Sequence, residues 1–396
     1  MTSRTPHSRL AADHPLRRLP HLGLTASGIG IAACVVLGAF DPTQVLRSYL
    51  VAFLFWLGIA LGALAVLSIH HVTGGAWGVA IRRPLEAAAQ TLPLLALLFV
   101  PIALAPGTLY EWAHPGAVAH DAVLAHKAPY LNVPFFVARA VLYFTAWILL
   151  TRAMVRWSRE QDAVGDVTGA ARRLQLVARG SLVVLGLTGT FASIDWIMSL
   201  EPHWFSTIYG ILFMGGCVLS ALAFAIPVTA LIADRPPFDA VVSADVFHDL
   251  GKLLLAFVLL WAYFSFSQFL IIWSGNLPEE ISWYLHRSQG GWTAVAVVLL
   301  VVHFAAPFAV LLSRSLKRRP RRLAVVALVL LAARYLDLFF LIVPAFEPDG
   351  LVVHALDPAT LVAIGGAWLV LFARRLVDEP PVPLRDESLP LTEANA

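Results

Sequence analysis

Residues 48–71 read SYLVAFLFWLGIALGALAVLSIHH and contain no Asp, Glu, Lys or Arg. A helix needs about 20 predominantly apolar residues to cross the ~30 Å hydrocarbon core of a bilayer. These 24 residues therefore predict a transmembrane helix. Apolar runs of comparable length recur on both sides of this stretch, so we expect the rest of the chain to be built in the same way.

The composition also indicates a membrane protein. Of the 396 residues, 59% are hydrophobic and only 13% are charged, whereas a soluble domain carries about 25% charged residues. A single soluble core does not explain this excess, because cores stop growing beyond about 250–300 residues. We therefore expect an all-α integral membrane protein with no soluble domain large enough to be an enzyme by itself.

The apolar runs predict ten transmembrane helices, of which the third is the shortest and is interrupted by Pro93, Pro101 and Pro106. The expected ranges are 24–40, 48–71, 91–105, 134–155, 174–200, 206–233, 246–273, 291–316, 322–345 and 358–376. This membrane domain, residues 24–376, follows an N-terminal segment, residues 1–23, in which we find no signal-peptide cleavage site. Residues 377–396 are expected to form a disordered tail.

The distribution of positive charge predicts the orientation. Of the 28 Lys and Arg residues, 21 fall on one side of the ten expected spans, three on the other and four within spans. Cytoplasmic loops carry an excess of Lys and Arg. Both termini are therefore expected in the cytoplasm.

Several cofactors are excluded by the available ligands. The two cysteines, Cys34 and Cys217, both lie in apolar runs and form no C-x-x-C motif, which excludes iron–sulfur clusters and c-type haem in this chain. His303 is the sole histidine expected in the middle of a span, whereas b-type haem needs two at matching depth. We expect no metal and no nucleic-acid partner.

Charges inside a span are costly and mark partners or polar pathways. Arg139 and Asp195 are each expected about five residues from the outer edge, which is ~8 Å deep, so they can pair across adjacent helices. Such a pair either fixes the helix register or has a functional role, and both interpretations stay open.

A second group of titratable residues is expected deeper in the membrane. It consists of Lys252, His303, Arg334 and Asp337, with Lys252 nearest the cytoplasm. Arg334 and Asp337 are three residues apart, so they share one helix face. Mutual neutralisation explains these two, and a proton-conducting half-channel explains the whole group.

The densest polar segment at a membrane edge is residues 195–209, DWIMSLEPHWFSTIY. Its carboxylates and His203 lie among aromatic residues that are typical of the membrane interface. A quinol head group needs hydrogen-bond acceptors for two hydroxyls, aromatic walls and an exit for protons. This segment is therefore a candidate wall of a quinol pocket.

The same segment resembles the NrfD-like quinol-interacting membrane subunits, and most closely the ActF-type subunit of bacterial alternative complex III. Three further stretches support this resemblance, namely residues 128–144 (APYLNVPFFVARAVLYF), residues 248–280 and the basic turn after the eighth span. The resemblance extends from about residue 45 to 375.

This resemblance implies two four-helix bundles, spans two to five and six to nine, with spans one and ten flanking them. It implies a place in the bacterial inner membrane beside a sister NrfD-like subunit, an iron–sulfur subunit, cytochrome c-type subunits and, in some cases, a terminal oxidase. The complex oxidises quinol, typically menaquinol, and the electrons travel through the partners. This subunit then handles quinol, protons or both.

Depth and side-chain chemistry suggest two candidate sites. The outer site, for quinol binding or proton exit, comprises Arg139, Asp195, Glu201, His203 and Gln268. The inner site, a proton half-channel, comprises Lys252, His303, Arg334 and Asp337.

Two other functions stay open. A secondary transporter is disfavoured because such proteins often show interrupted spans in corresponding positions of two halves, and here only the third span is clearly interrupted. A purely structural anchor for redox partners predicts that neutralising Asp195 or Asp337 leaves quinol oxidation unchanged.

Overall fold

A computed structural model describes residues 15–163, 167–233 and 242–378. In these ranges ten helices are long and apolar enough to cross a membrane, which confirms the predicted all-α membrane fold. They are α1 (Leu19–Gly38), α2 (Pro42–Thr73), the consecutive α3 (Ala76–Ala89), α4 (Leu92–Leu98) and α5 (Val100–Leu104), α8 (Val133–Ala163), α9 (Val167–Trp196), α10 (Tyr209–Ile232), α11 (Ala244–Gly275), the consecutive α13 (Trp292–Val298), η6 (Leu299–Ala305) and α14 (Ala306–Leu311), α16 (Pro320–Ile342) and α17 (Leu356–Asp378).

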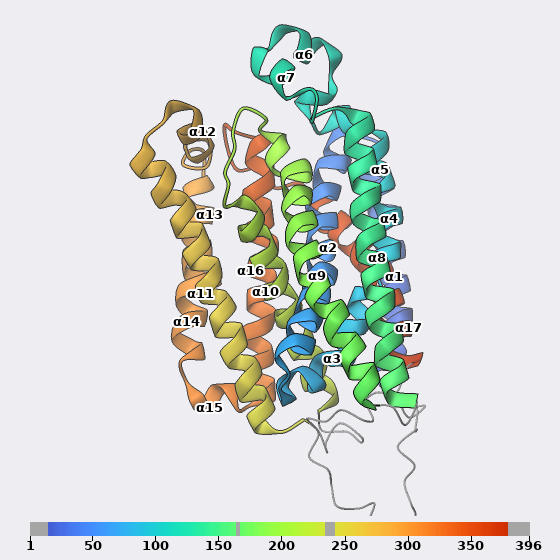
Figure 1. Ribbon diagram of the computed structural model, residues 1–396. Helices are drawn as coiled ribbons and strands as arrows, with labels where there is room; N and C mark the ends of the chain where they lie inside the picture. The colour runs from blue at the N-terminus through green and yellow to red at the C-terminus, as the bar shows by residue number, and fades with distance from the viewer. Residues whose placement is uncertain (1–14, 164–166, 234–241, 379–396) are drawn as a thin grey trace, which may run out of the picture.

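The spans form two four-helix bundles (Figure 1). The first contains α2, the α3–α5 span, α8 and α9, and the second contains α10, α11, the α13–α14 span and α16. Helix α17 packs on α2 and α3, and α1 packs mainly on α17. This arrangement agrees with the predicted pair of bundles with the first and last spans at their side.

Helices α2 and α10 join the two bundles. In the most apolar part of α2, 94% of the residues are buried, so this helix is surrounded by protein. The two helices meet at Gly62, where an added Cβ atom would lie 1.8 Å from the carbonyl oxygen of Cys217. Glycine is required there because any side chain would force the two helices apart.

The third span begins earlier than predicted. The expected range was 91–105, whereas the helical span runs over Ala76–Leu104. Arg82 and Arg83 were expected in a loop, and this expectation is wrong, because both lie buried in α3. Within the helix, Glu86 forms ion pairs with both guanidinium groups.

The neighbouring helix α8 completes this polar cluster. Arg82 donates hydrogen bonds from Nη2 to Ser158 Oγ at 2.8 Å and to Gln161 Oε1 at 2.9 Å. Arg83 forms an ion pair with Asp162. A hydropathy pattern does not reveal these partners, because they lie more than 70 residues away in the sequence.

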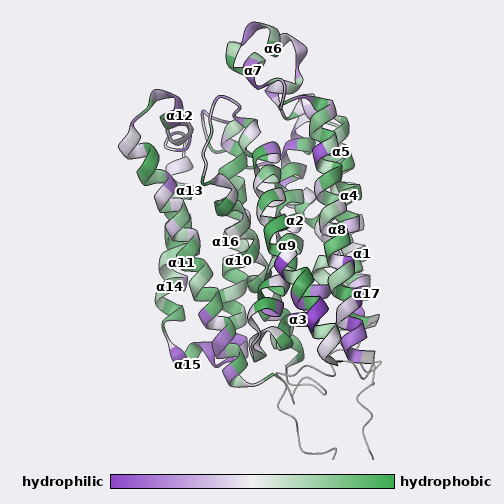
Figure 2. Ribbon diagram, in the orientation of Figure 1, coloured by the Kyte–Doolittle hydropathy of each residue, from purple (hydrophilic) through white to green (hydrophobic). Residues whose placement is uncertain are grey.

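Short elements cap the two ends of the bundles. One end, called the outer end from here on, carries the 3-10 helices η2 (Pro106–Thr108), η3 (Glu111–Ala113), η4 (Met198–Leu200) and η7 (Val343–Ala345), with α6 (Pro115–His120), α7 (Ala122–Lys127) and α12 (Pro278–His286). The opposite, inner end carries η1 (Pro15–Arg18) and α15 (Arg314–Lys317). Apolar residues dominate the spans between these ends (Figure 2).

Because ten spans alternate in direction, α1 begins and α17 ends at the same, inner end. Their placement in the cytoplasm stays a prediction from the charge distribution. The predicted disordered tail lies outside the described residues from position 379 onward.

Candidate functional site

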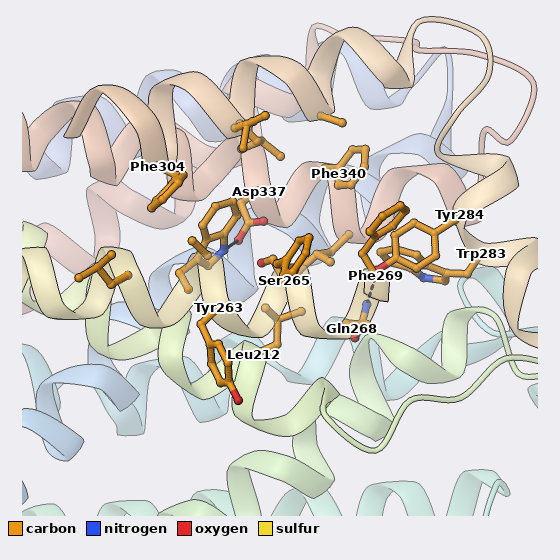
Figure 3. Close-up of a pocket in the computed structure, with 18 residues that line it drawn as sticks. Leu212, Tyr263, Ser265, Gln268, Phe269, Trp283, Tyr284, Phe304, Asp337 and Phe340 are labelled. Carbon is orange, nitrogen blue, oxygen red and sulfur yellow. Dashed lines mark hydrogen bonds between the residues drawn. The ribbon is translucent and has the colours of Figure 1, made fainter. Parts of the chain in front are cut away.

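A cavity of about 580 Å³ lies in the second bundle, between α11, α12, the α13–η6–α14 span and α16 (Figure 3). Its walls are mainly aromatic and aliphatic. The side chains of Tyr263, Phe266 and Phe269 at its rim are exposed on the surface of α11. Since this part of α11 lies within a transmembrane span, the cavity faces the lipid rather than an aqueous phase.

A buried carboxylate forms part of the cavity wall. Asp337 accepts a hydrogen bond at Oδ2 from Nε1 of Trp261 at 3.2 Å, and Arg334 forms an ion pair with the same oxygen. Oδ1 of Asp337 accepts no hydrogen bond from any residue that the structure describes. The wall therefore holds one carboxylate oxygen with free acceptor capacity.

Arg334 has room beside Asp337 because α10 carries a glycine opposite it. An added Cβ atom at Gly216 would lie 2.2 Å from Cζ of Arg334. The guanidinium therefore packs directly against the backbone of α10. Since Arg334 is only 1% exposed, this packing and the ion pair fix the position of the Asp337 carboxylate.

His303 lies next to this pair on η6, which is a π-helix. Single π-helical turns occur frequently at functional sites. The ring is 0% exposed, and neither ring nitrogen has a hydrogen-bond partner among the described residues. It packs edge-on against Trp261, with ring centroids 4.1 Å apart. Leaving a buried donor or acceptor unsatisfied costs about 1–3 kcal/mol, so His303 is poised for a further polar partner.

The outer end of the cavity has a second polar group of residues. Gln268 accepts a hydrogen bond at Oε1 from Ser206 Oγ at 3.1 Å, and its Nε2 lies 3.5 Å from Tyr284 Oη. Burial raises the pKa of Tyr284 to about 12, so its hydroxyl stays protonated at neutral pH. Asp337 and Gln268 therefore present hydrogen-bonding groups at two separate places in one apolar cavity.

Arg287 holds the outer wall in place. It stacks on Trp283 at 3.7 Å and donates hydrogen bonds to the carbonyl oxygens of Phe340 and Leu341 at the end of α16. It also forms an ion pair with Glu201 at 2.8 Å. This one buried guanidinium thus connects the end of α12 and α16, which line the cavity, with the loop before α10.

The predicted inner group is only partly brought together. His303, Arg334 and Asp337 cluster around Trp261, but Lys252 does not join them. Lys252 is 56% exposed and pairs with Asp249 at 2.6 Å. It precedes Trp261 on α11 by nine residues, or ~14 Å along the helix.

The predicted outer group divides between the two bundles. Arg139 and Asp195 form the expected pair in the first bundle, with Nε–Oδ2 and Nη2–Oδ1 distances of 2.8 and 2.9 Å. Tyr143 donates a third hydrogen bond to Asp195, which is 0% exposed. Trp196, the residue after Asp195, stacks on Phe144 of α8.

The other members of the outer group lie elsewhere. Gln268 belongs to the cavity of the second bundle, and Glu201 supports its outer wall. His203 Nε2 lies 2.6 Å from Asp121 Oδ2 at the outer surface. The predicted division into an outer and an inner site is therefore replaced by one cavity that takes residues from both, with Asp195 outside it.

Sequence reasoning missed Trp261, Tyr284 and Arg287. Trp261 and Gln268 are seven residues apart on α11, and this spacing places them on one helix face. That periodicity could have linked the two. Arg287 gave no such signal, because its partners come from distant segments.

No protein-family model matches the chain, and no curated protein is significantly similar to it. Among the described residues, no group of three or more His, Cys, Asp or Glu side chains is arranged to hold a metal ion. The chemical interpretation of the cavity therefore rests on its own geometry.

Proposed function

We propose that this chain is an NrfD-like membrane subunit of a respiratory quinol:electron-acceptor oxidoreductase of the alternative complex III type. In this proposal the cavity of the second bundle accepts a quinol head group, with menaquinol as the expected species. The observation that carries it is a lipid-facing apolar cavity that reaches a buried carboxylate, Asp337. A quinol needs this combination, because it diffuses within the membrane and gives up protons when it is oxidised.

The side chains have defined roles in this proposal. Asp337 accepts a proton from one hydroxyl of the quinol, and Arg334 positions its carboxylate. Gln268 and Tyr284 hydrogen-bond the other end of the head group. Aromatic residues such as Phe269 and Phe340 form the walls and exclude water.

His303 provides the next site for the proton. It lies beside Trp261, and none of the described residues forms a hydrogen bond with its ring nitrogens, which can therefore bond a water molecule. In this proposal the proton passes from Asp337 to His303, while Arg334 stays charged and positions the Asp337 carboxylate. The electrons pass to the proposed sister, iron–sulfur and cytochrome c-type subunits, because this chain is expected to hold no redox centre.

The most direct test is to purify the native assembly from membranes. We expect haem-bearing and iron–sulfur subunits to co-purify, together with quinol:acceptor activity. Isolation of the chain as a stable solitary protein that transports a solute would refute the proposal and favour the secondary transporter.

The role of the cavity is tested by Asp337→Asn in that assembly. General base catalysis contributes about 10²–10⁴-fold, so quinol turnover should fall at least 100-fold while subunit composition is retained. The control is Glu160→Gln, which removes a half-exposed carboxylate at the inner end of α8. Unchanged turnover in Asp337→Asn would leave the chain as a structural anchor.

A further inference from the structure

The inner end of the second bundle carries a concentration of positive charge in the turn between α14 and α16. Residues 313–322 read SRSLKRRPRR and contain six basic residues. Four of them have exposed side chains, namely Arg314, Arg319, Arg321 and Arg322. Figure 2 shows hydrophilic colouring at α15 and at the adjoining end of α11.

Nearby carboxylates do not neutralise these four arginines. Asp245 pairs with Arg318, and Asp249 pairs with Lys252. Among the described residues, the ion pairs at this end leave the four arginines of the turn without an acidic partner. The turn therefore keeps a strong positive potential.

Lys317 distinguishes this turn from an ordinary basic loop. Its side chain is only 7% exposed and packs over Gly251 of α11, where an added Cβ atom would lie 2.6 Å from Cγ of Lys317. No carboxylate lies within ion-pair distance of its ammonium group among the described residues. The packed stem therefore holds the ammonium group at the turn, where an external anion can pair with it.

The turn lies at the boundary of the hydrocarbon region. The spans on either side end at Leu311 and begin at Pro320. Directly beside the basic residues, Leu312 and Val325 expose their apolar side chains. An anionic group at the turn thus has apolar surface next to it along the membrane-facing sides of α14 and α16.

We propose that Lys317 and the surrounding arginines bind the phosphate of an anionic phospholipid whose acyl chains lie along α14 and α16. Basic pockets between transmembrane helices bind such head groups. The site is at the opposite end of the second bundle from the proposed quinol head group, and it does not depend on that function.

Native mass spectrometry of the full-length chain, or of its assembly, tests this proposal. The protein is titrated in detergent with phosphatidylglycerol or phosphatidylcholine, and in a third arm phosphatidylglycerol competes with inorganic phosphate. We expect phosphatidylglycerol to bind at least tenfold more tightly than phosphatidylcholine. Millimolar inorganic phosphate should displace it only partly, because free phosphate lacks acyl chains.

Three variants define the site. Lys317→Met keeps the apolar stem over Gly251 and should weaken phosphatidylglycerol binding at least tenfold. Arg321→Gln with Arg322→Gln should weaken it about 25-fold, at about fivefold for each charge. The matched control, Arg156→Gln, removes an exposed arginine at the inner end of the first bundle and should change nothing.

The outcomes separate the alternatives. Equal affinity for both lipids overturns the proposal, and the arginines would then be a binding surface for an acidic partner protein. Complete displacement by inorganic phosphate overturns the lipid as the occupant and leaves a free-anion site. If Lys317→Met fails to fold, the double arginine variant decides, because its side chains are exposed and unpaired.

Discussion

The buried pair of Arg139 and Asp195 gives a quantitative prediction about stability. Asp195 accepts hydrogen bonds from Nε and Nη2 of Arg139 at 2.8 and 2.9 Å and from Tyr143 at 2.8 Å. Replacing it in Asp195→Asn removes the negative charge but keeps the shape of the side chain. The variant therefore leaves a buried guanidinium without a counter-charge between α8 and α9.

The size of the effect follows from what Arg139 retains. Breaking a buried pair by removing one partner costs about 3–5 kcal/mol. Arg139 keeps a hydrogen bond from Nη1 to the carbonyl oxygen of Tyr130 at 2.9 Å. It also keeps cation–π contacts with Tyr130 and Phe135 at 3.9 and 4.3 Å. These contacts lessen the penalty, so we expect Asp195→Asn to lower the free energy of unfolding by about 3 kcal/mol.

A double-mutant cycle separates the pair from its surroundings. The two single variants of the cycle are Asp195→Leu and Arg139→Met, and the double variant combines these two substitutions. Apolar replacements of a whole buried pair are often neutral or stabilising, so the double variant should be more stable than either single one. Reversible unfolding in mixed detergent and dodecyl sulfate, followed by tryptophan fluorescence, measures these free energies.

Two results would refute this reasoning. A loss below about 1 kcal/mol in Asp195→Asn would mean that the pair is hydrated in the membrane. A double variant as unstable as the sum of the single variants would mean that the two charges do not depend on each other. Either result would mean that the ion pair does not stabilise the packing of α8 against α9.

Three further predictions concern other contacts. Gly216→Ala should displace Arg334 from Asp337 and lower the free energy of unfolding by about 3 kcal/mol, whereas Gly186→Ala, which meets nothing within 4 Å, should have little effect in the same unfolding assay. Arg287→Gln should lower the free energy of opening of the outer cavity wall by about 2–4 kcal/mol. Limited proteolysis should then cleave α12 faster, and unchanged cleavage would contradict this prediction. The hydrogen bond with His203 lowers the pKa of Asp121 below its ordinary value of 3.8. This contact therefore stabilises the short helices at the outer end above pH 3.8, and the stabilisation is lost as the pH falls below that value. Carboxyl chemical shifts of Asp121 through a titration check the direction, and a midpoint above 3.8 would show it to be wrong.

The sequence by itself determined the membrane architecture. The bilayer imposes a fixed length on every apolar run, so the stretch at residues 48–71 and its counterparts predicted ten spans before any contact was known. The same rule placed Arg139 and Asp195 at equal depth, and the structure confirms their pairing. It failed at the third span, because Arg82 and Arg83 lie buried in α3 among distant partners.

Only the tertiary structure decided which polar residues share a site. Gln268 and Asp337 were expected in different groups, yet they line one cavity, and Lys252 pairs at the inner end instead. Hydropathy fixes the depth of a residue but not the direction in which its helix face points. That direction depends on how neighbouring helices pack, as where α10 presents Gly216 to the guanidinium of Arg334.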